Sequence, residues 1–252
     1  MRTHVVLQRR ESERAVAHEI ADLIATCRAA GHGAVLGLAT GGTMRGVYAE
    51  LVRLHREQGL DLSDVSTFNL DEYLGLSAGD PRSCRSFMQT EFFDSVNLDP
   101  KRCLVPDPEL ARADPEGYCQ GWEQAIQRAG GIDLQLLGLG RNGHVAFNEP
   151  GSPRESRTRV VELDDITRED AVRAFGTQDA VPRRAITMGV ATILDARRLR
   201  VLAFGAHKAE IVRAVLTGEP GPRLPGTWLT AHADLQVWLD RDAAEELPAE
   251  LR

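Results

Sequence analysis

Three segments of the sequence follow one pattern, in which a short apolar run ends in glycine or polar residues and a helical pattern follows. The runs are AVLGLAT at 34–40, LQLLGLG at 134–140 and LRVLAFG at 199–205. Strands that are apolar along nearly their whole length are buried on both faces, and their alternation with helices is typical of a parallel sheet. We therefore expect an α/β fold with helices on both faces of a mostly parallel sheet.

Further segments fit the same architecture. Apolar residues recur with helical spacing over 14–29, 44–58 and 210–217, and residues 65–70 and 235–239 have the composition of strands. The core face of the first helix is predicted to carry Ala15, Ile20, Leu23 and Ile24. No linker or internal repeat divides the 252 residues, so we expect a single domain over residues 1–252.

Charge and composition exclude several classes of function. The formal net charge of −7 argues against nonspecific binding to nucleic acid. No apolar run approaches the roughly 20 residues needed to cross a bilayer, and the first residues do not resemble a secretory signal. The four cysteines, Cys27, Cys84, Cys103 and Cys119, form no C-x-x-C pair, which favours free thiols in a reducing compartment. The sequence thus predicts a cytoplasmic protein without nucleic acid or membrane as partner.

Thr40, Gly41, Gly42 and Thr43 form a loop between the first apolar run and a helical pattern. Backbone N–H groups at the positive end of a helix dipole bind anions, and the two hydroxyl groups are close by. The loop matches neither the P-loop nor the dinucleotide-binding pattern, which disfavours ATP and NAD. A phosphate site is one interpretation, and a tight turn without a ligand is the other.

Two adjacent acids, Asp71 and Glu72, follow the apolar run at 65–70. Shielding by Phe68 and Tyr73 would raise the pKa of such a carboxyl group and suit it to act as a base at the rim of the sheet. An acid at this place could equally cap the next helix. The segment alone favours neither interpretation.

A glycine-rich turn precedes the histidine of the segment GLGRNGH at 138–144. Gly143 allows a sharp bend, and His144 is the residue type whose ordinary pKa lies nearest neutrality. Glu149 could hold the imidazole ring and stabilise its protonated form, with Asn142 beside it. A lone histidine next to glycine is usually structural or exposed, but these two neighbours favour a role in proton transfer.

Two basic residues are candidates for binding an anion. Lys208 follows the third apolar run near the start of a helix, where a positive charge is unfavourable unless an anion lies between it and the helix. Lys208 and Lys101 are the only lysines among 30 basic residues. Arg173 belongs to a helical stretch after residues 164–165, and an ordinary solvated helix face explains it equally well.

Four blocks of the sequence together resemble the glucosamine-6-phosphate deaminases, a family of amino-sugar catabolism in a superfamily that includes the 6-phosphogluconolactonases. The blocks are LGLATGGT at 36–43, FNLDEYLGL at 68–76, GLGRNGHVAFNEP at 138–150, and AITMGVATIL at 185–194, which runs on to His207 and Lys208. They stand in family order, and the resemblance covers nearly the whole chain. It implies a Rossmann-like open α/β sheet and an enzyme that makes fructose 6-phosphate and ammonia from glucosamine 6-phosphate, without metal or organic cofactor.

The resemblance also implies a role for each candidate residue. Asp71 would move a proton between C2 and C1 of the sugar, with Glu72 as its support. His144, oriented by Glu149 and Asn142, would open the pyranose ring. The pocket for the substrate phosphate would consist of Thr40, Gly41, Gly42, Thr43, Arg173 and Lys208. Ring opening, proton transfer at carbon and hydrolysis of an imine need only two acid/base groups and an anion anchor.

The sequence departs from the family pattern at three places. Some members have aspartate where this chain has Asn142, and an amide stabilises an imidazolium less than a carboxylate does. The segment SCRS at 83–86 stands where members often have a tyrosine in a mobile lid. Allosterically regulated members have a basic residue in place of Val161, although Arg159 and Ser152 match the rest of that effector site. We therefore expect weak or absent activation by N-acetylglucosamine 6-phosphate.

Three other functions remain open at this point. A 6-phosphogluconolactonase needs a phosphate pocket and a histidine base but has no carbon acid to deprotonate, and the segments at 71–73 and 147–150 fit the deaminases better. A deaminase of galactosamine 6-phosphate would differ only in the partner of one hydroxyl group. A non-catalytic sugar-phosphate sensor would normally carry a DNA-binding module, for which too few residues precede the first expected strand.

The sequence also leaves open whether the protein forms a homo-oligomer, because relatives occur as monomers and as hexamers.

Overall fold

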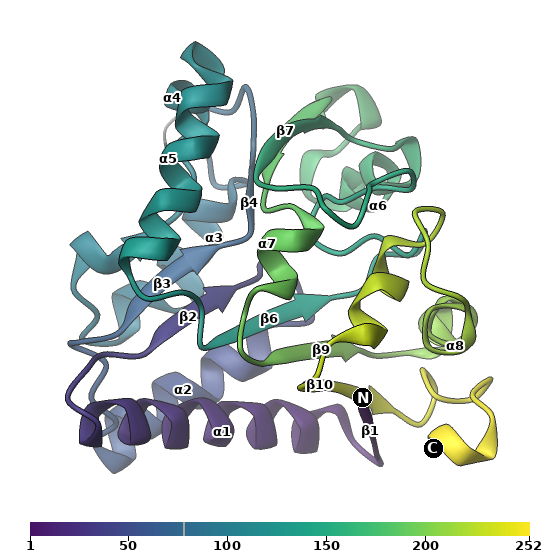
Figure 1. The fold of residues 1–252 in the computed structure, drawn as a ribbon, viewed down its shortest axis with the longest axis horizontal. Helices are drawn as coiled ribbons and strands as arrows, with labels where there is room; N and C mark the ends of the chain where they lie inside the picture. The colour runs from purple at the N-terminus through teal and green to yellow at the C-terminus, as the bar shows by residue number, and fades with distance from the viewer. Residues whose placement is uncertain (78) are drawn as a thin grey trace.

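The computed structural model describes residues 1–77 and 79–252, and its main feature is a seven-stranded sheet (Figure 1). The strands lie in the order β1-β10-β9-β6-β2-β3-β5, and each pairing in this sheet is parallel. Their bounds are β1 Arg2–Val6, β2 Val35–Leu38, β3 Ser66–Asn69, β5 Cys103–Leu104, β6 Leu134–Gly138, β9 Leu199–Ala203 and β10 Leu235–Asp240. The prediction of an α/β fold on a mostly parallel sheet is confirmed.

The three apolar runs form the middle of the large sheet. β2, β6 and β9 each have a strand on both sides, and every residue of β2 and β9 is buried. Burial on both faces explains why these segments are almost entirely apolar and not alternating, with Gln135 and Arg200 as buried polar exceptions. The strands end at Leu38, Gly138 and Ala203, so the glycines and polar residues that follow are loops at one edge of the sheet.

Helices cover both faces of the large sheet, as predicted. Figure 1 shows α1 (Arg9–Ala29) and α2 (Arg45–Gln58) on one side and α5 (Pro115–Arg128) and α7 (Val190–Leu194) on the other. The remaining helices are α3 Cys84–Glu91, α4 Pro108–Ala113, α6 Asp165–Phe175 and α8 Ala209–Thr217, with 3-10 turns at Phe93–Ser95, Pro100–Arg102, Gln178–Ala180, Ala206–Lys208, Pro225–Ala231 and Ala249–Leu251. In the two described ranges, no helix is both long and apolar enough to cross a bilayer.

Helix α1 is longer than predicted, because it begins at Arg9 and not near residue 14. Its fully buried residues include Val16, Ile20 and Ile24, which follow one another at a spacing of four and share a face. Ala15 lies one position outside this stripe and is partly exposed, so its assignment to the core was wrong. One hydrophobic core continues from this helix to Leu247 near the C-terminus.

The strand β1 was not predicted, and it forms the edge of the large sheet next to β10. Its residues pair in parallel from Arg2 with Gln236 to Val6 with Asp240. The ring of His4 stacks on that of Trp238, with 4.0 Å between their centres. An edge strand is only half-buried, so its sequence lacks the continuous apolar run that identified the central strands.

A second, three-stranded antiparallel sheet has the order β4-β8-β7 and was also not predicted. Its strands are β4 Asp71–Tyr73, β8 Arg184–Thr187 and β7 Arg159–Glu162. β4 follows β3 after the single residue Leu70, and Asp71 stands opposite Thr187 of β8. The small sheet therefore begins where the large one ends and fixes the backbone on both sides of Asp71.

Candidate active site

A cavity of about 370 Å³ lies where the loops after β2, β3, β6 and β9 meet. Ligands of open α/β sheets occupy this position, beyond the carboxyl ends of the strands. Four groups of predicted residues line the cavity: the loop at 40–43, Asp71, His144 and Lys208. The remaining lining residues are Ala39, Leu70, Tyr73, Gly138, Leu139, Gly140, Ala146, Phe147, Thr167, Asp170 and Ala171.

The loop at 40–43 leaves its backbone open toward the cavity. Gly41 has φ of +107°, a conformation that favours glycine, and both Gly41 and Gly42 are exposed. Arg9 of α1 holds the loop from outside, since its guanidinium donates to the carbonyl oxygens of Gly42 and Thr43 at 2.5 and 3.2 Å. No side chain caps the N-terminus of α2, which follows the loop. The N–H groups at this end of the helix are thus a candidate site for an anion.

Lys208 supplies a positive charge to the same cavity. Its Nζ donates to the carbonyl oxygen of Leu139 at 2.7 Å. In residues 1–77 and 79–252, no carboxylate lies within ion-pair distance of this ammonium group. Burial lowers its pKa, an effect that nearby Asp170 partly offsets. A half-buried ammonium without a counter-ion, facing an uncapped helix, is suited to hold the phosphate of a ligand.

Arg173 and Glu72 were both predicted among the substrate- and phosphate-binding residues, but neither lines the cavity. Arg173 lies in α6, as the sequence indicated, but its side chain is exposed and does not line the cavity. The same helix presents Asp170, which pairs with Arg141 at 2.7 Å between Oδ1 and Nε. In this conformation the solvated helix face, which was the alternative interpretation, describes Arg173 correctly.

Asp71 is the buried carboxyl group of the cavity, with 7% of its surface exposed. Burial raises its pKa from 3.8 to about 7, whereas a hydrogen bond from the Cys84 thiol lowers it and the charge of Glu72 raises it. A carboxylate with this pKa can accept a proton from carbon near neutral pH and release it again. The pKa shift that we expected from shielding is therefore present at Asp71.

Glu72 has a different environment from its neighbour, although both are buried. Its carboxylate accepts hydrogen bonds from the backbone N–H groups of Cys84 and Arg85 at 3.0 and 2.9 Å, at the start of α3. It also accepts one from the N–H of Tyr73 at 2.8 Å, and it does not line the cavity. The helix-capping interpretation thus holds for Glu72, and its geometry fits support of the site rather than contact with a ligand.

His144 is held by three neighbours. Its Nδ1 lies 3.4 Å from Oε2 of Glu149 and 3.1 Å from the hydroxyl oxygen of Thr167 in α6. The side chain of Asn142 joins the group, because its Nδ2 donates to Oε2 of Glu149 at 2.9 Å and its Oδ1 accepts from the N–H of His144 at 3.2 Å. Burial is the largest single influence on the pKa of Glu149 and raises it, but the hydrogen bonds from His144, Thr167 and Asn142 and the charge of His144 together lower the pKa overall. An ionised Glu149 places a negative charge beside Nδ1 of His144.

Two positions in the turn before His144 require glycine for steric reasons. Gly143 has φ of +79°, which permits the bend. A Cβ atom on Gly140 would lie 2.3 Å from Cε1 and Nε2 of His144, so the imidazole packs directly on this Cα. Ala146, in the cavity wall, has φ of +52°, a backbone conformation that costs energy for a residue with a Cβ. The backbone around the histidine is therefore shaped to place its ring.

Replacing Gly140 with alanine should reduce turnover by about tenfold or more, because the new methyl group must displace the imidazole by an ångström or so. Steady-state turnover of the best substrate, with circular dichroism to verify folding, checks this result. Gly121→Ala in α5 is the matched control, since a Cβ there meets no atom within 4 Å. An active Gly140→Ala enzyme would show that the position of the ring is not critical.

Two contacts of the site were not predicted. Thr167 bonds to His144 from α6, and nothing in its local sequence distinguishes it from other threonines. Cys84 was assigned to a lid because of its place in the family pattern, but it is buried next to Asp71. In the described part of the chain, no three His, Cys, Asp or Glu side chains are arranged to hold a metal ion.

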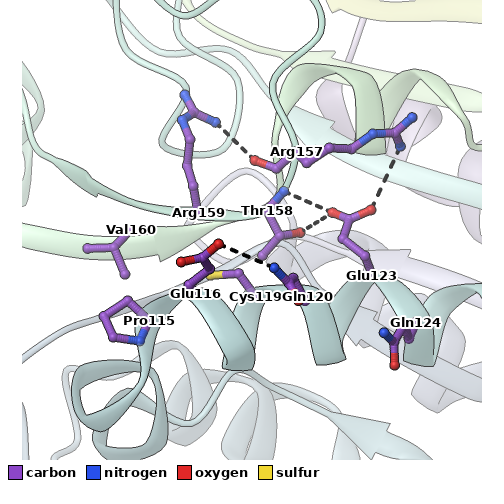
Figure 2. Close-up of a pocket in the computed structure, with 10 residues that line it drawn as sticks. All are labelled: Pro115, Glu116, Cys119, Gln120, Glu123, Gln124, Arg157, Thr158, Arg159 and Val160. Carbon is purple, nitrogen blue, oxygen red and sulfur yellow. Dashed lines mark hydrogen bonds and ion pairs between the residues drawn. The ribbon is translucent and has the colours of Figure 1, made fainter.

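A larger hollow, of about 660 Å³, lies between α5 and β7 and shares no lining residue with the first cavity (Figure 2). Figure 2 shows Glu123 bonded to Thr158 in its wall. The Glu123 carboxylate accepts bonds from the N–H and hydroxyl of Thr158 at 2.8 and 2.5 Å and from the hydroxyl of Thr192 at 2.6 Å. Glu123 is thus engaged in hydrogen bonds within the protein. Asp71 and His144 both lie in the smaller cavity.

The fold and this site together define a class of protein. It is an open α/β protein with a cavity at the carboxyl edge of a parallel sheet, where an uncapped helix N-terminus and a lysine lie near a buried carboxyl group and a histidine–glutamate pair. The family model described as glucosamine-6-phosphate isomerases/6-phosphogluconolactonase matches residues 8–238. The chain belongs to this family.

Individual relatives agree with the family match. A glucosamine-6-phosphate deaminase from Bacillus velezensis is 48% identical over 211 residues, which cover 84% of this chain and 87% of the relative. Glucosamine-6-phosphate deaminase 2 from Giardia intestinalis is 44% identical over 92% of this chain and 86% of its own length. A solved structure of a monomeric glucosamine-6-phosphate deaminase superposes with a TM-score of 0.93 and 41% identity, covering 98% of this chain and all of that one.

The second branch of the family is more distant. The 6-phosphogluconolactonase from Leishmania guyanensis superposes with a TM-score of 0.76 over 98% of this chain and 99% of its own, at 22% identity. At that level the similarity concerns the fold alone. The Rossmann-like α/β architecture is thus common to both branches, and the choice between their reactions depends on the site.

Proposed function

We propose that this protein is an enzyme that converts glucosamine 6-phosphate to fructose 6-phosphate and ammonia. One observation carries the proposal: Asp71, a carboxyl group whose pKa is raised to about 7, faces a cavity that also contains the candidate anion site and a histidine. The relatives named glucosamine-6-phosphate deaminases, at 42 to 48% identity over most of the chain, support the same reaction. The reaction belongs to amino-sugar catabolism, including the use of N-acetylglucosamine.

The geometry supports one division of labour. The loop at 40–43 and Lys208 bind the phosphate and thereby fix the sugar in the cavity. His144, with Glu149 ionised beside it, transfers a proton to the ring oxygen and opens the pyranose. Asp71 removes the proton from C2 and returns it to C1, which yields an imine at C2. Water then adds to the imine and ammonia leaves, so the chemistry is an isomerisation coupled to deamination and not a simple hydrolysis.

The carbon-acid step separates this proposal from lactone hydrolysis. A lactonase would use a histidine to activate water and has no proton to remove from carbon. The burial that raises the pKa of Asp71 costs free energy of folding, and a lactonase would have no use for it. A sugar-phosphate sensor would likewise need the anion site but neither acid/base group.

The test compares substrates side by side. Ammonia release, coupled to detection of the ketose phosphate, is measured on glucosamine 6-phosphate and on galactosamine 6-phosphate. We expect turnover of the glucosamine compound, with a kcat/KM at least about tenfold above that of its epimer, since one misplaced hydroxyl costs roughly 1.4 kcal/mol or more. Faster turnover of galactosamine 6-phosphate would support the same reaction but contradict glucosamine 6-phosphate as the preferred substrate. Binding of both without turnover would instead support the sensor.

Replacing Lys208 with alanine should raise KM by about ten- to a hundredfold with a smaller change in kcat. The ammonium group contacts the phosphate in the ground state as well as in the transition state, and a charge-assisted bond of this kind is worth about 1.5–3 kcal/mol. Initial rates over a range of substrate concentrations check this. Lys101→Ala, the only other lysine and an exposed one, is the control. An unchanged KM would remove Lys208 from the phosphate site.

N-acetylglucosamine 6-phosphate should activate the enzyme weakly or not at all. The basic residue of regulated relatives is Val161 here, in β7. Arg159 is engaged within the chain, where it donates to the side-chain oxygens of Asn148 and Ser152 at 2.8 and 2.9 Å. Rate curves with and without the compound should therefore coincide and be hyperbolic. A sigmoidal curve that becomes hyperbolic on its addition would contradict this prediction.

We also propose a cytoplasmic location and a sugar phosphate as the natural partner. Three of the four cysteines are buried and all four are free, which suits a reducing compartment. The relative described as monomeric has the same fold over the whole chain, which favours a monomer over a homo-oligomer. Light scattering of the purified protein would distinguish the two states.

A further inference from the structure

The thiol of Cys84 lies between the loop at 40–43 and Asp71. Its Sγ is 3.5 Å from Oδ1 of Asp71, to which the S–H donates. It also accepts a hydrogen bond from the hydroxyl group of Thr40, again at 3.5 Å. Only 4% of the residue is exposed. These contacts connect the end of β2, the start of α3 and the carboxyl group of β4 through one sulfur atom.

The backbone that carries this thiol is fixed from two sides. Cys84 is the first residue of α3, and its N–H donates to Glu72 at 3.0 Å. Ser83 caps the N-terminus of this helix, since its hydroxyl oxygen accepts a hydrogen bond from the N–H of Ser86 at 3.0 Å. Because Glu72 is the chain neighbour of Asp71, the cap that positions the thiol and the group that the thiol contacts belong to the same strand. The distance between sulfur and carboxylate is therefore set by rigid elements.

No other group in the described ranges donates a hydrogen bond to the Asp71 carboxylate. Burial and the neighbouring carboxylates raise the pKa of the Cys84 thiol well above its ordinary value, so it remains an S–H donor at neutral pH. A bond to the ionised form of a carboxyl group favours that form. The other titratable or charged groups around Asp71 are Glu72 and Tyr73 of β4, Tyr48 of α2, and the cavity residues His144 and Lys208.

We propose that Cys84 is a positioning residue for the proton transfer, whose thiol orients the Asp71 carboxylate and keeps it ionised for attack on the substrate. The inference rests on the proposed function, in which Asp71 is the base. The thiol acts only through Asp71 and does not itself exchange a proton with the sugar. As a weak donor it favours the ionised carboxylate without removing its basicity, whereas a strong donor would lower its reactivity.

The test is the pH profile of kcat/KM for ammonia release in the wild type, Cys84→Ala and Cys84→Ser. We expect the acidic limb of Cys84→Ala to move up by about half to one pH unit, with a loss of about three- to tenfold at pH 6.5 that vanishes near pH 8.5. Cys84→Ser, which retains a donor, should keep the limb at or below its wild-type position. Titration of the substrate itself cancels, because all enzymes are compared on the same compound.

Cys119→Ala is the matched control, since Cys119 is also a buried thiol but lies in a separate apolar cluster with Ala111 and Ile186. Its profile should coincide with that of the wild type. If Cys84→Ala lowers kcat/KM by the same factor at every pH, the inference is overturned, and the thiol contributes only to packing. If Cys84→Ala does not fold, a limb of Cys84→Ser above the wild type overturns it. Absence of ammonia from the wild type would refute the proposed function itself.

Discussion

Asp71→Asn should lower kcat for ammonia release by about a thousandfold or more, because the described residues that line the cavity include no other buried carboxyl group to take the proton from C2. The amide keeps the size of the side chain and removes only the basicity. Substrate affinity should change little, since the phosphate is held by the loop at 40–43 and by Lys208. Single-turnover rates and isothermal titration with glucosamine 6-phosphate measure the two effects separately.

The same variant should be more stable than the wild type above neutral pH. The folded-state pKa of Asp71 is raised from 3.8 to about 7, so the folded protein holds this proton more tightly than the unfolded chain does. The stabilisation of the folded state by protonated Asp71 is therefore fully present below pH 4 and is lost as the pH rises through about 7. Burying the charge then costs up to about 4 kcal/mol at pH 8. Chemical denaturation at pH 8 should show a gain, and equal stability together with full activity would refute the assignment of Asp71 as the base.

His144→Gln should lower kcat on the pyranose form of the substrate by about a hundredfold. Glutamine can form hydrogen bonds but cannot shuttle a proton to the ring oxygen, and general acid/base groups contribute roughly 100- to 10,000-fold. Steady-state rates over pH 6–9 measure the loss, with thermal unfolding as the check on folding.

Glu149→Gln separates the role of the ring from that of its partner. The amide keeps the contact with Asn142 but removes the negative charge beside Nδ1 of His144. We expect a smaller loss, of about tenfold, because the neutral partner stabilises the imidazolium less. A Glu149→Gln enzyme as impaired as His144→Gln would mean that the carboxylate takes part in proton transfer directly. An active His144→Gln enzyme would show that ring opening needs no protein group.

The central strands were predictable because burial on both faces leaves a clear trace in the sequence. β2, β6 and β9 are almost entirely apolar and lead into glycine-containing loops, and that pattern indicated the sheet and the edge at which ligands bind. β1 and β7 are only half-buried and β8 begins with the exposed Arg184, so their sequences carry no comparable apolar run. The antiparallel sheet that carries Asp71 therefore emerged only from the fold.

The roles of Asp71 and Glu72 could not be separated from the sequence. Successive side chains in a strand point to opposite faces, so one of two adjacent acids in β4 reaches the cavity and the other does not. The helix that Glu72 caps begins twelve residues later, and its direction depends on the fold. Arg173 poses the converse problem, since its helix was predictable but the face on which it stands was not. The loop at 40–43, His144 and Lys208 could be chosen as candidates because each lies in the segment that follows one of the three apolar strands.

The most direct test of the central claim is the stoichiometry of the products. Purified protein is incubated at pH 8 with glucosamine 6-phosphate or with 6-phosphogluconolactone, and ammonia, fructose 6-phosphate and free acid are quantified. We predict equal amounts of ammonia and fructose 6-phosphate from the amino sugar, absent with Asp71→Asn, and no hydrolysis of the lactone above its spontaneous rate. Hydrolysis of the lactone without ammonia from the amino sugar would contradict the account.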